Sequence, residues 1–106
     1  FIHVMDLAEA HHATLDYLIN NDPMVLNLNI GTGKGTSVLE LVNKFSEVNK
    51  CNIRYIFSDR RIGDVTRLVA DNNLALKILN WNPKRDINKI CKDGWNWQTR
   101  NPKGYI

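Results

Sequence analysis

The sequence has few cysteines, no long apolar run and no basic cluster, and each scarcity excludes a class of protein. Its 106 residues include two cysteines, Cys51 and Cys91. Two distant cysteines do not form a disulfide framework or a multi-cysteine zinc site, so we expect reduced thiols. No apolar run approaches the roughly 18 residues of a membrane helix, and the acidic opening FIHVMDLAEAHH differs from a signal peptide. We expect a cytoplasmic protein with no membrane partner.

Clustered positive charge is also missing. The formal net charge is +3, from 14 Lys and Arg against 11 Asp and Glu. The basic residues are scattered without a run of five, whereas nucleic-acid-binding proteins usually present a basic patch. We expect no nucleic-acid partner, and a small basic module for nucleotides or nucleic acid stays as an alternative.

The pattern of apolar residues alternates between helical and extended segments, within the length of one domain. Ser37 and Glu40 have the spacing of a capping box, and Asp71 and Asp86 stand where helices would begin. These signals predict helices over 4–19, 38–48, 71–79 and 86–99, and strands over 25–30, 53–57 and, more briefly, 68–70. The expected fold class is α/β, with about four helices and short strands in a single domain, 1–106.

The stretch GTGKGTS, residues 31–37, lies between a predicted strand and a predicted helix, where nucleotides are often bound. A phosphate-binding P-loop needs Gly-Lys-Ser/Thr, but here Lys34 precedes Gly35. A dinucleotide fingerprint needs a third glycine where Thr36 stands. We therefore interpret the stretch as a tight structural turn, and an anion at the helix N-terminus is the open alternative.

A second polar loop, SDRRIGD at residues 58–64, is the better candidate for binding a ligand. Arginine suits two-pronged contact with phosphate, and an acidic side chain nearby can accept hydrogen bonds from sugar hydroxyls. The alternative is that the arginines are solvated or paired with Asp59.

The histidines near one end and the tryptophans near the other do not indicate a metal site or a ligand-stacking site. His3, Asp6, His11 and His12 do not follow the His-Glu-x-x-His spacing, so we expect no metal. The three tryptophans lie near apolar helical positions, which favours packing over stacking on a base or sugar: Trp81, Trp95 and Trp97.

Several segments, taken in order, resemble the C-terminal part of the UDP-glucose 4-epimerase family, which belongs to the extended short-chain dehydrogenases/reductases. They are FIHVMDLAEAHH, VLNLNIGTGKGTSVLELV, SDRRIGDVTRLVADNNLALKILNWNP and DGWNWQTRNPKGY. The first and third are shared widely among nucleotide-sugar epimerases and dehydratases, whereas the last is more particular to the galactose epimerases.

The resemblance implies that this chain is one part of a two-domain enzyme. Family members hold NAD in an N-terminal Rossmann domain, and a smaller C-terminal domain closes over the UDP-sugar. This chain has no Gly-x-x-Gly-x-x-Gly and no Tyr-x-x-x-Lys. We therefore expect a C-terminal fragment that lacks the Rossmann domain, has no catalytic residues, binds no NAD alone, and self-associates. A fragment of another NAD-dependent nucleotide-sugar epimerase or dehydratase is the alternative.

Four substrate-binding residues follow from matching the family's motifs. Arg61 matches the arginine that contacts the UDP diphosphate, and Asp64 the aspartate that meets the ribose hydroxyls. Phe1 matches a Tyr/Phe position beside the nucleotide and lacks any hydroxyl. Leu68 matches a position on the sugar side, and its intermediate size leaves acceptance of N-acetylhexosamines open.

Overall fold

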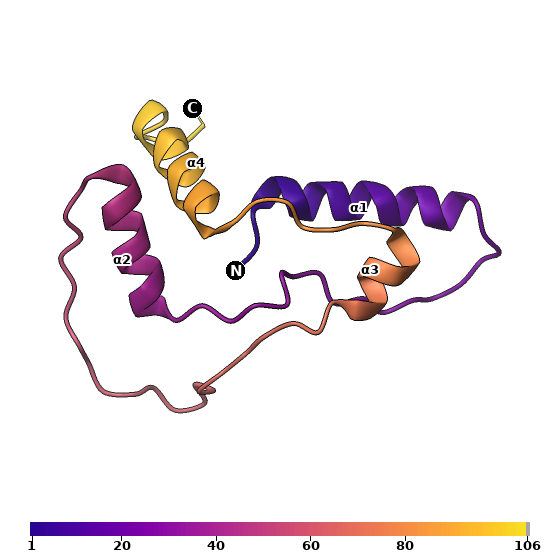
Figure 1. Cartoon of the computed structure of the whole chain (residues 1–106), viewed down its shortest axis with the longest axis horizontal. Coiled ribbons are helices and arrows are strands. Elements are labelled where there is room, and N and C mark those ends of the chain that lie inside the picture. Colours follow the sequence, from indigo (N-terminus) through magenta and orange to yellow (C-terminus); the bar gives the residue numbers. More distant parts are fainter. Residues whose placement is uncertain (106) are drawn as a thin grey trace.

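The computed structural model describes residues 1–105, and its regular structure consists of four α-helices (Figure 1). They are α1 (Val4–Ile19), α2 (Val38–Asn49), α3 (Asn73–Leu79) and α4 (Ile87–Arg100). Helix α2 packs against α4, and α1 packs against α3, so the helices form two separate pairs. Long irregular segments join the pairs into an open frame, as Figure 1 shows.

The helices begin where side chains can cap them. Ser37 and Glu40 form the expected capping box of α2, with Ser37 Oγ accepting from the Glu40 N–H at 3.1 Å and Glu40 Oε2 accepting from the Ser37 N–H at 2.6 Å. Asp86 accepts from the Lys89 N–H at 2.9 Å and caps α4, also as expected. The predicted cap of α3 is wrong by one residue: Asn72 occupies the N-cap and has no side-chain capping bond.

The strand predictions are wrong for the described residues. None of residues 1–105 belongs to a strand, and the segments over 25–30, 53–57 and 68–70 are irregular. A strand requires a neighbour that pairs with its backbone N–H and C=O groups, and alternation in the sequence cannot supply that neighbour. Alternation did predict one-sided burial, because Leu26, Leu28 and Ile30 are partly buried while the residues between them are exposed.

The apolar core is small and lies between α1 and α3. It consists of Ala10, Ala75, Leu79 and Trp81, with Leu28, Ile30 and a few further side chains packed around it. A second contact joins α2 to α4, where the rings of Phe45 and Trp95 meet edge to face at 5.7 Å. Asn49 Nδ2 also donates to the Cys91 carbonyl at 3.2 Å in that contact.

The chain is more open than a self-sufficient domain of its length. Its radius of gyration is 17.0 Å, whereas a compact chain of this length has about 13 Å. Its accessible surface is 8846 Å², against about 6,100 Å² for a typical folded protein of 12.2 kDa. Within residues 1–105, no helix combines the length and apolar character needed to cross a membrane.

Candidate nucleotide-binding site

Arg61 and Asp64 meet in an exposed turn of the irregular segment between α2 and α3. The Asp64 N–H donates to the Arg61 carbonyl at 3.3 Å, and Arg61 Nε donates to Asp64 Oδ2 at 3.1 Å. The Arg61 side chain is 86% exposed, so its guanidinium is open to an incoming anion. The arginine pairs with the aspartate three residues on, not with Asp59.

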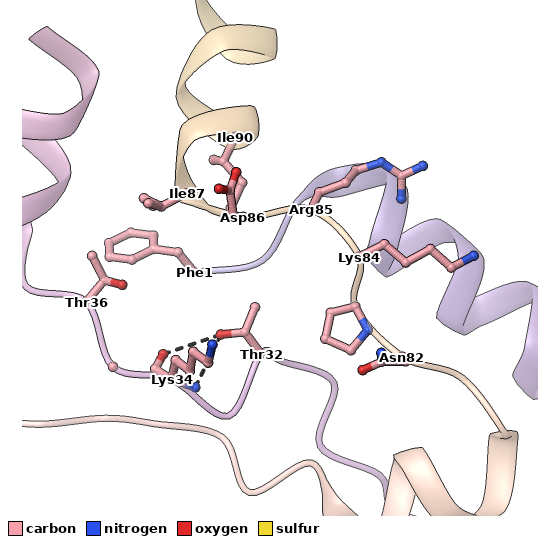
Figure 2. A pocket seen from close by; sticks show the side chains of 12 residues that line it. Phe1, Thr32, Lys34, Thr36, Asn82, Lys84, Arg85, Asp86, Ile87 and Ile90 are labelled. Carbon is pink, nitrogen blue, oxygen red and sulfur yellow. Dashed lines mark hydrogen bonds between the residues drawn. The ribbon is translucent and has the colours of Figure 1, made fainter. Parts of the chain in front are cut away.

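The structure does not bring Phe1 to that turn. Phe1 instead borders a cavity of about 610 Å³ between residues 32–36 and 82–90. Figure 2 shows Phe1, Thr36 and Ile87 around this cavity. Leu68 is 89% exposed on the stretch after the Arg61 turn and does not line the cavity. Within residues 1–105, Arg61 and Asp64 therefore lie together, whereas Phe1 lies at the cavity and Leu68 has no observed contact with either.

The cavity beside Phe1 has a mixed charge. Lys34, Lys84 and Arg85 all line it (Figure 2). However, Lys84 Nζ lies 3.6 Å from Glu9 Oε2, and Arg85 is also paired with acidic side chains. Sequence reasoning missed this cavity because the segments that form it carry no common motif.

The glycine stretch 31–35 packs against residues 69–72 and does not form a phosphate cradle. A Cβ on Gly31 would lie 2.7 Å from the Ala70 Cβ, and one on Gly35 would lie 3.1 Å from Val69 Cγ2. Gly33 has φ +71°, a conformation that favours glycine. Asn72 Nδ2 donates to the Gly31 carbonyl at 2.6 Å from a buried position. The glycines are needed for this close contact, which supports the interpretation as a structural turn.

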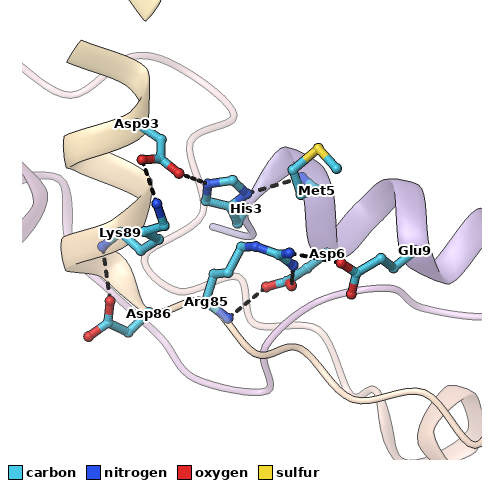
Figure 3. Close-up of polar contacts among 8 residues, drawn as sticks. All are labelled: His3, Met5, Asp6, Glu9, Arg85, Asp86, Lys89 and Asp93. Carbon is cyan, nitrogen blue, oxygen red and sulfur yellow. Dashed lines mark hydrogen bonds and ion pairs between the residues drawn. The ribbon is translucent and has the colours of Figure 1, made fainter. Parts of the chain in front are cut away.

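An ionic network fixes the start of α1, directly after Phe1 (Figure 3). The carboxylate of Asp6 is fully buried, and it accepts from the Arg85 N–H at 3.0 Å and from Arg85 Nη1. Arg85 Nη2 donates to Glu9 Oε1 at 2.8 Å. The network therefore ties α1 to the segment that leads into α4.

His3 has a structural role that its place among acidic and histidine residues did not reveal. Its Nδ1 accepts from the Met5 N–H at 3.1 Å and caps α1, while Nε2 lies 3.1 Å from Asp93 Oδ2 on α4 (Figure 3). An imidazole whose Nδ1 accepts carries its proton on Nε2, which donates to the carboxylate. Within residues 1–105, no group of three or more His, Cys, Asp or Glu side chains is arranged to hold a metal ion.

Sequence comparison and backbone comparison both find UDP-glucose 4-epimerases. No family model matches the chain. The chain is 44% identical to UDP-glucose 4-epimerase of Drosophila melanogaster over 106 residues, and 42% identical to UDP-glucose 4-epimerase of Bacillus subtilis over 105 residues. Each match covers 99% of this chain, 30% of the fly protein and 31% of the bacterial one.

A solved structure with the same backbone is UDP-glucose 4-epimerase from Bifidobacterium longum in complex with NAD+ and UDP. It superposes with a TM-score of 0.90 at 37% identity, over 99% of this chain and 31% of that chain. The chain thus spans about 30% of the length of the relatives that it matches. By sequence and by backbone, the chain corresponds to the C-terminal part of the UDP-glucose 4-epimerases.

Proposed function

We propose that the chain is a C-terminal fragment of a UDP-glucose 4-epimerase and supplies the UDP-sugar-binding half of its site. The observation that carries this proposal is the match to those enzymes over 99% of the chain, with a TM-score of 0.90 to one solved with NAD+ and UDP. No comparison favours another nucleotide-sugar enzyme or a nucleic-acid-binding module.

Arg61 and Asp64 are the proposed contacts to the nucleotide. A diphosphate offers pairs of anionic oxygens, which match the planar donor groups of a guanidinium. Asp64 Oδ2 now accepts from Arg61 Nε at 3.1 Å, so a diphosphate would replace that carboxylate on the arginine. The carboxylate would then be available to accept from the ribose hydroxyls. Leu68 would face the sugar, and Phe1 would border the nucleotide.

The remaining chemistry belongs to a preceding Rossmann domain in this proposal. NAD held there would supply the hydride chemistry at the sugar C4, and a Tyr-x-x-x-Lys pair of that domain would handle the hydroxyl proton. In this division the present chain would contribute contacts to the substrate, and it contains no Tyr-x-x-x-Lys pair for proton transfer. Without that domain we expect neither NAD binding nor any conversion of UDP-galactose to UDP-glucose in a coupled assay. Saturable turnover by the isolated chain would contradict this division of labour.

The same domain would supply strand partners in this proposal. Residues 25–30 bury one face and expose the other, and their backbone groups form no hydrogen bonds with one another or with other described residues. Such a segment is ready to pair with a neighbouring strand. We propose that it does so in the full-length enzyme, which would restore the α/β class. A cytoplasmic location also belongs to the proposal, since Cys51 and Cys91 are unpaired thiols.

Calorimetric titration of UDP into the full-length enzyme tests the nucleotide contacts. Arg61→Ala removes a hydrogen bond to a charged group, worth roughly 1.5–3 kcal/mol, and should weaken UDP binding by about one to two powers of ten. Asp64→Asn should weaken it more mildly through the ribose.

The matched control for these variants is Lys34→Ala, which removes a cation from the glycine stretch and should leave UDP and NAD affinity nearly unchanged. If Lys34→Ala is damaging and Arg61→Ala is silent, the glycine stretch is the nucleotide site and the proposal fails.

A further inference from the structure

The segment that carries Arg61, Asp64 and Leu68, residues 52–68, forms no hydrogen bond to the rest of the described chain. Within residues 1–105, the hydrogen bonds of residues 52–68 are those between Arg61 and Asp64. One end is fixed where the Cys51 N–H donates to the Ser46 carbonyl at 3.2 Å, after α2. The other end is the contact of residues 69–72 with the glycine stretch.

That second contact is close and geometrically specific. The Gly31 backbone approaches Ala70 so nearly that a Cβ would lie 2.7 Å from the Ala70 Cβ, with no other heavy atom outside its chain neighbours within 4 Å. Asn72 Nδ2 reaches the Gly31 carbonyl at 2.6 Å. Asn72 is 7% exposed, so this bond is shielded from competing water. The contact therefore leaves no room for a side chain at position 31 and holds residues 69–72 against the glycine stretch.

We propose that the glycine stretch is a positioning device for the UDP-binding loop, with Gly31 and Asn72 as its positioning residues. This inference rests on the proposed function. Leu68 directly precedes the contact, and Asp64 lies five residues before Val69, a span of at most about 17 Å. In this proposal, a displacement of residues 69–72 shifts Leu68 first and then the turn that holds Arg61 and Asp64, because residues 52–68 form no hydrogen bond to other described residues that would hold the turn in place.

The test is a pair of compensating substitutions in the full-length enzyme, read by UDP and NAD affinity. Gly31→Ala introduces the 2.7 Å clash and should weaken UDP binding by about tenfold, because misplacement by about an ångström is costly at a binding site. NAD affinity should stay unchanged. Adding Ala70→Gly removes the only atom that the new methyl meets and should restore UDP affinity.

A matched control is Gly94→Ala in α4, where an added Cβ meets nothing within 4 Å and should leave UDP affinity unchanged.

Asn72→Asp is a second variant that keeps the shape of the side chain and loses its donor. It should weaken UDP binding in the same direction as Gly31→Ala, and it decides the matter if Gly31→Ala does not fold.

The possible results distinguish failure of the positioning role from failure of the proposed function. If the unaltered enzyme does not bind UDP, the proposed function is wrong. If it binds UDP through Arg61, but Gly31→Ala and Asn72→Asp bind UDP as tightly as the unaltered enzyme, the positioning role alone is wrong. The positioning role is equally wrong if Gly31→Ala loses UDP and NAD together and Ala70→Gly restores neither.

Discussion

Asp6 is a carboxylate with no exposed surface, and it is hydrogen-bonded to Arg85, 79 residues further along the chain. Burial by itself would raise its pKa, but hydrogen bonds from the Arg85 N–H and guanidinium outweigh burial and hold the pKa below the ordinary value of 3.8. The same guanidinium lowers the pKa of Glu9. Both acids therefore stay ionised at neutral pH, and Asp6 joins α1 to the segment before α4.

Replacing Asp6 should be the most damaging single polar change near α1. Asp6→Asn weakens bonds to the charged Arg85, and we expect the free energy of unfolding of the full-length enzyme to fall by about 2–3 kcal/mol. The control is Asp16→Asn, at an exposed position on the same helix that pairs only with His12 four residues before it. In urea denaturation, the midpoint should be lower than that of the unaltered enzyme for Asp6→Asn and unchanged for Asp16→Asn. Equal midpoints for the two variants would mean that the buried pair of Asp6 and Arg85 contributes little to the free energy of unfolding.

Acid should weaken the same network. A carboxylate whose folded-state pKa is depressed binds fewer protons folded than unfolded, so its contribution is complete above the unfolded pKa and is lost as pH falls through the folded one. Asp6 and Glu9 are depressed in this way, and the Lys89 ammonium lowers the pKa of Asp93 likewise. The contribution of these three carboxylates to stability should therefore be complete above about pH 5 and decline as the pH falls below it. Thermal melts across this range, with Asp6→Asn showing a shallower decline, check the assignment.

At the element scale, the sequence predicted what is local and missed what depends on distant partners. All four helices were predicted within two residues of their observed ends, because their signals are caps and periodicity within one segment. The strand predictions failed because alternation within a segment does not supply a neighbouring strand, and none of residues 1–105 forms one. His3 and Asn72 were missed as structural residues for a similar reason, since their contacts lie 90 and 41 residues away.

The candidate site shows the same division between local and distant information. Arg61 and Asp64 lie three residues apart, so a loop motif was enough to predict that they act together. Phe1 is 60 residues from Arg61 in the sequence, so only the fold could bring the two together. The structure instead places Phe1 at the cavity between residues 32–36 and 82–90. The family resemblance supplied the residue, and no local motif could supply its position in the fold.

The capping box of α2 gives a prediction at this scale. Ser37→Ala removes the acceptor for the Glu40 N–H and should destabilise the full-length enzyme by about 1 kcal/mol. Ser46→Ala, within the same helix, is the matched control and should be neutral, because alanine favours helix at least as well as serine does. Denaturation midpoints of the two variants measure the difference. A Ser37→Ala midpoint no lower than that of Ser46→Ala would show that the cap is not needed.

At the scale of the whole molecule, the chain has too little core for its surface. Among residues 1–105, the buried hydrophobic residues are Ala10, Ala75, Leu79, Trp81 and Cys91. Burial raises the pKa of the Cys91 thiol, which keeps it neutral. Its surface exceeds that of a compact protein of equal mass by roughly 2,800 Å², which is more than a standard protein interface buries. Large apolar side chains stay exposed on several segments, among them Val25, Ile56, Phe57 and Ile62. Such a surface is typical of one part of a larger assembly.

We therefore expect the isolated chain to self-associate when it is produced alone. Contact with a second copy would remove apolar area from water, at roughly 25 cal/mol per Å², and this gain rises with concentration by mass action. Light scattering coupled to size exclusion should show dimers or larger species where the monomer has a mass of 12.2 kDa. Adding the separately produced Rossmann domain should compete with this association, because in our proposal that domain covers the same side chains. A stable, compact monomer at high concentration would show instead that the chain rearranges to bury its own apolar surface, and the open frame in Figure 1 would then describe only the chain joined to its partner.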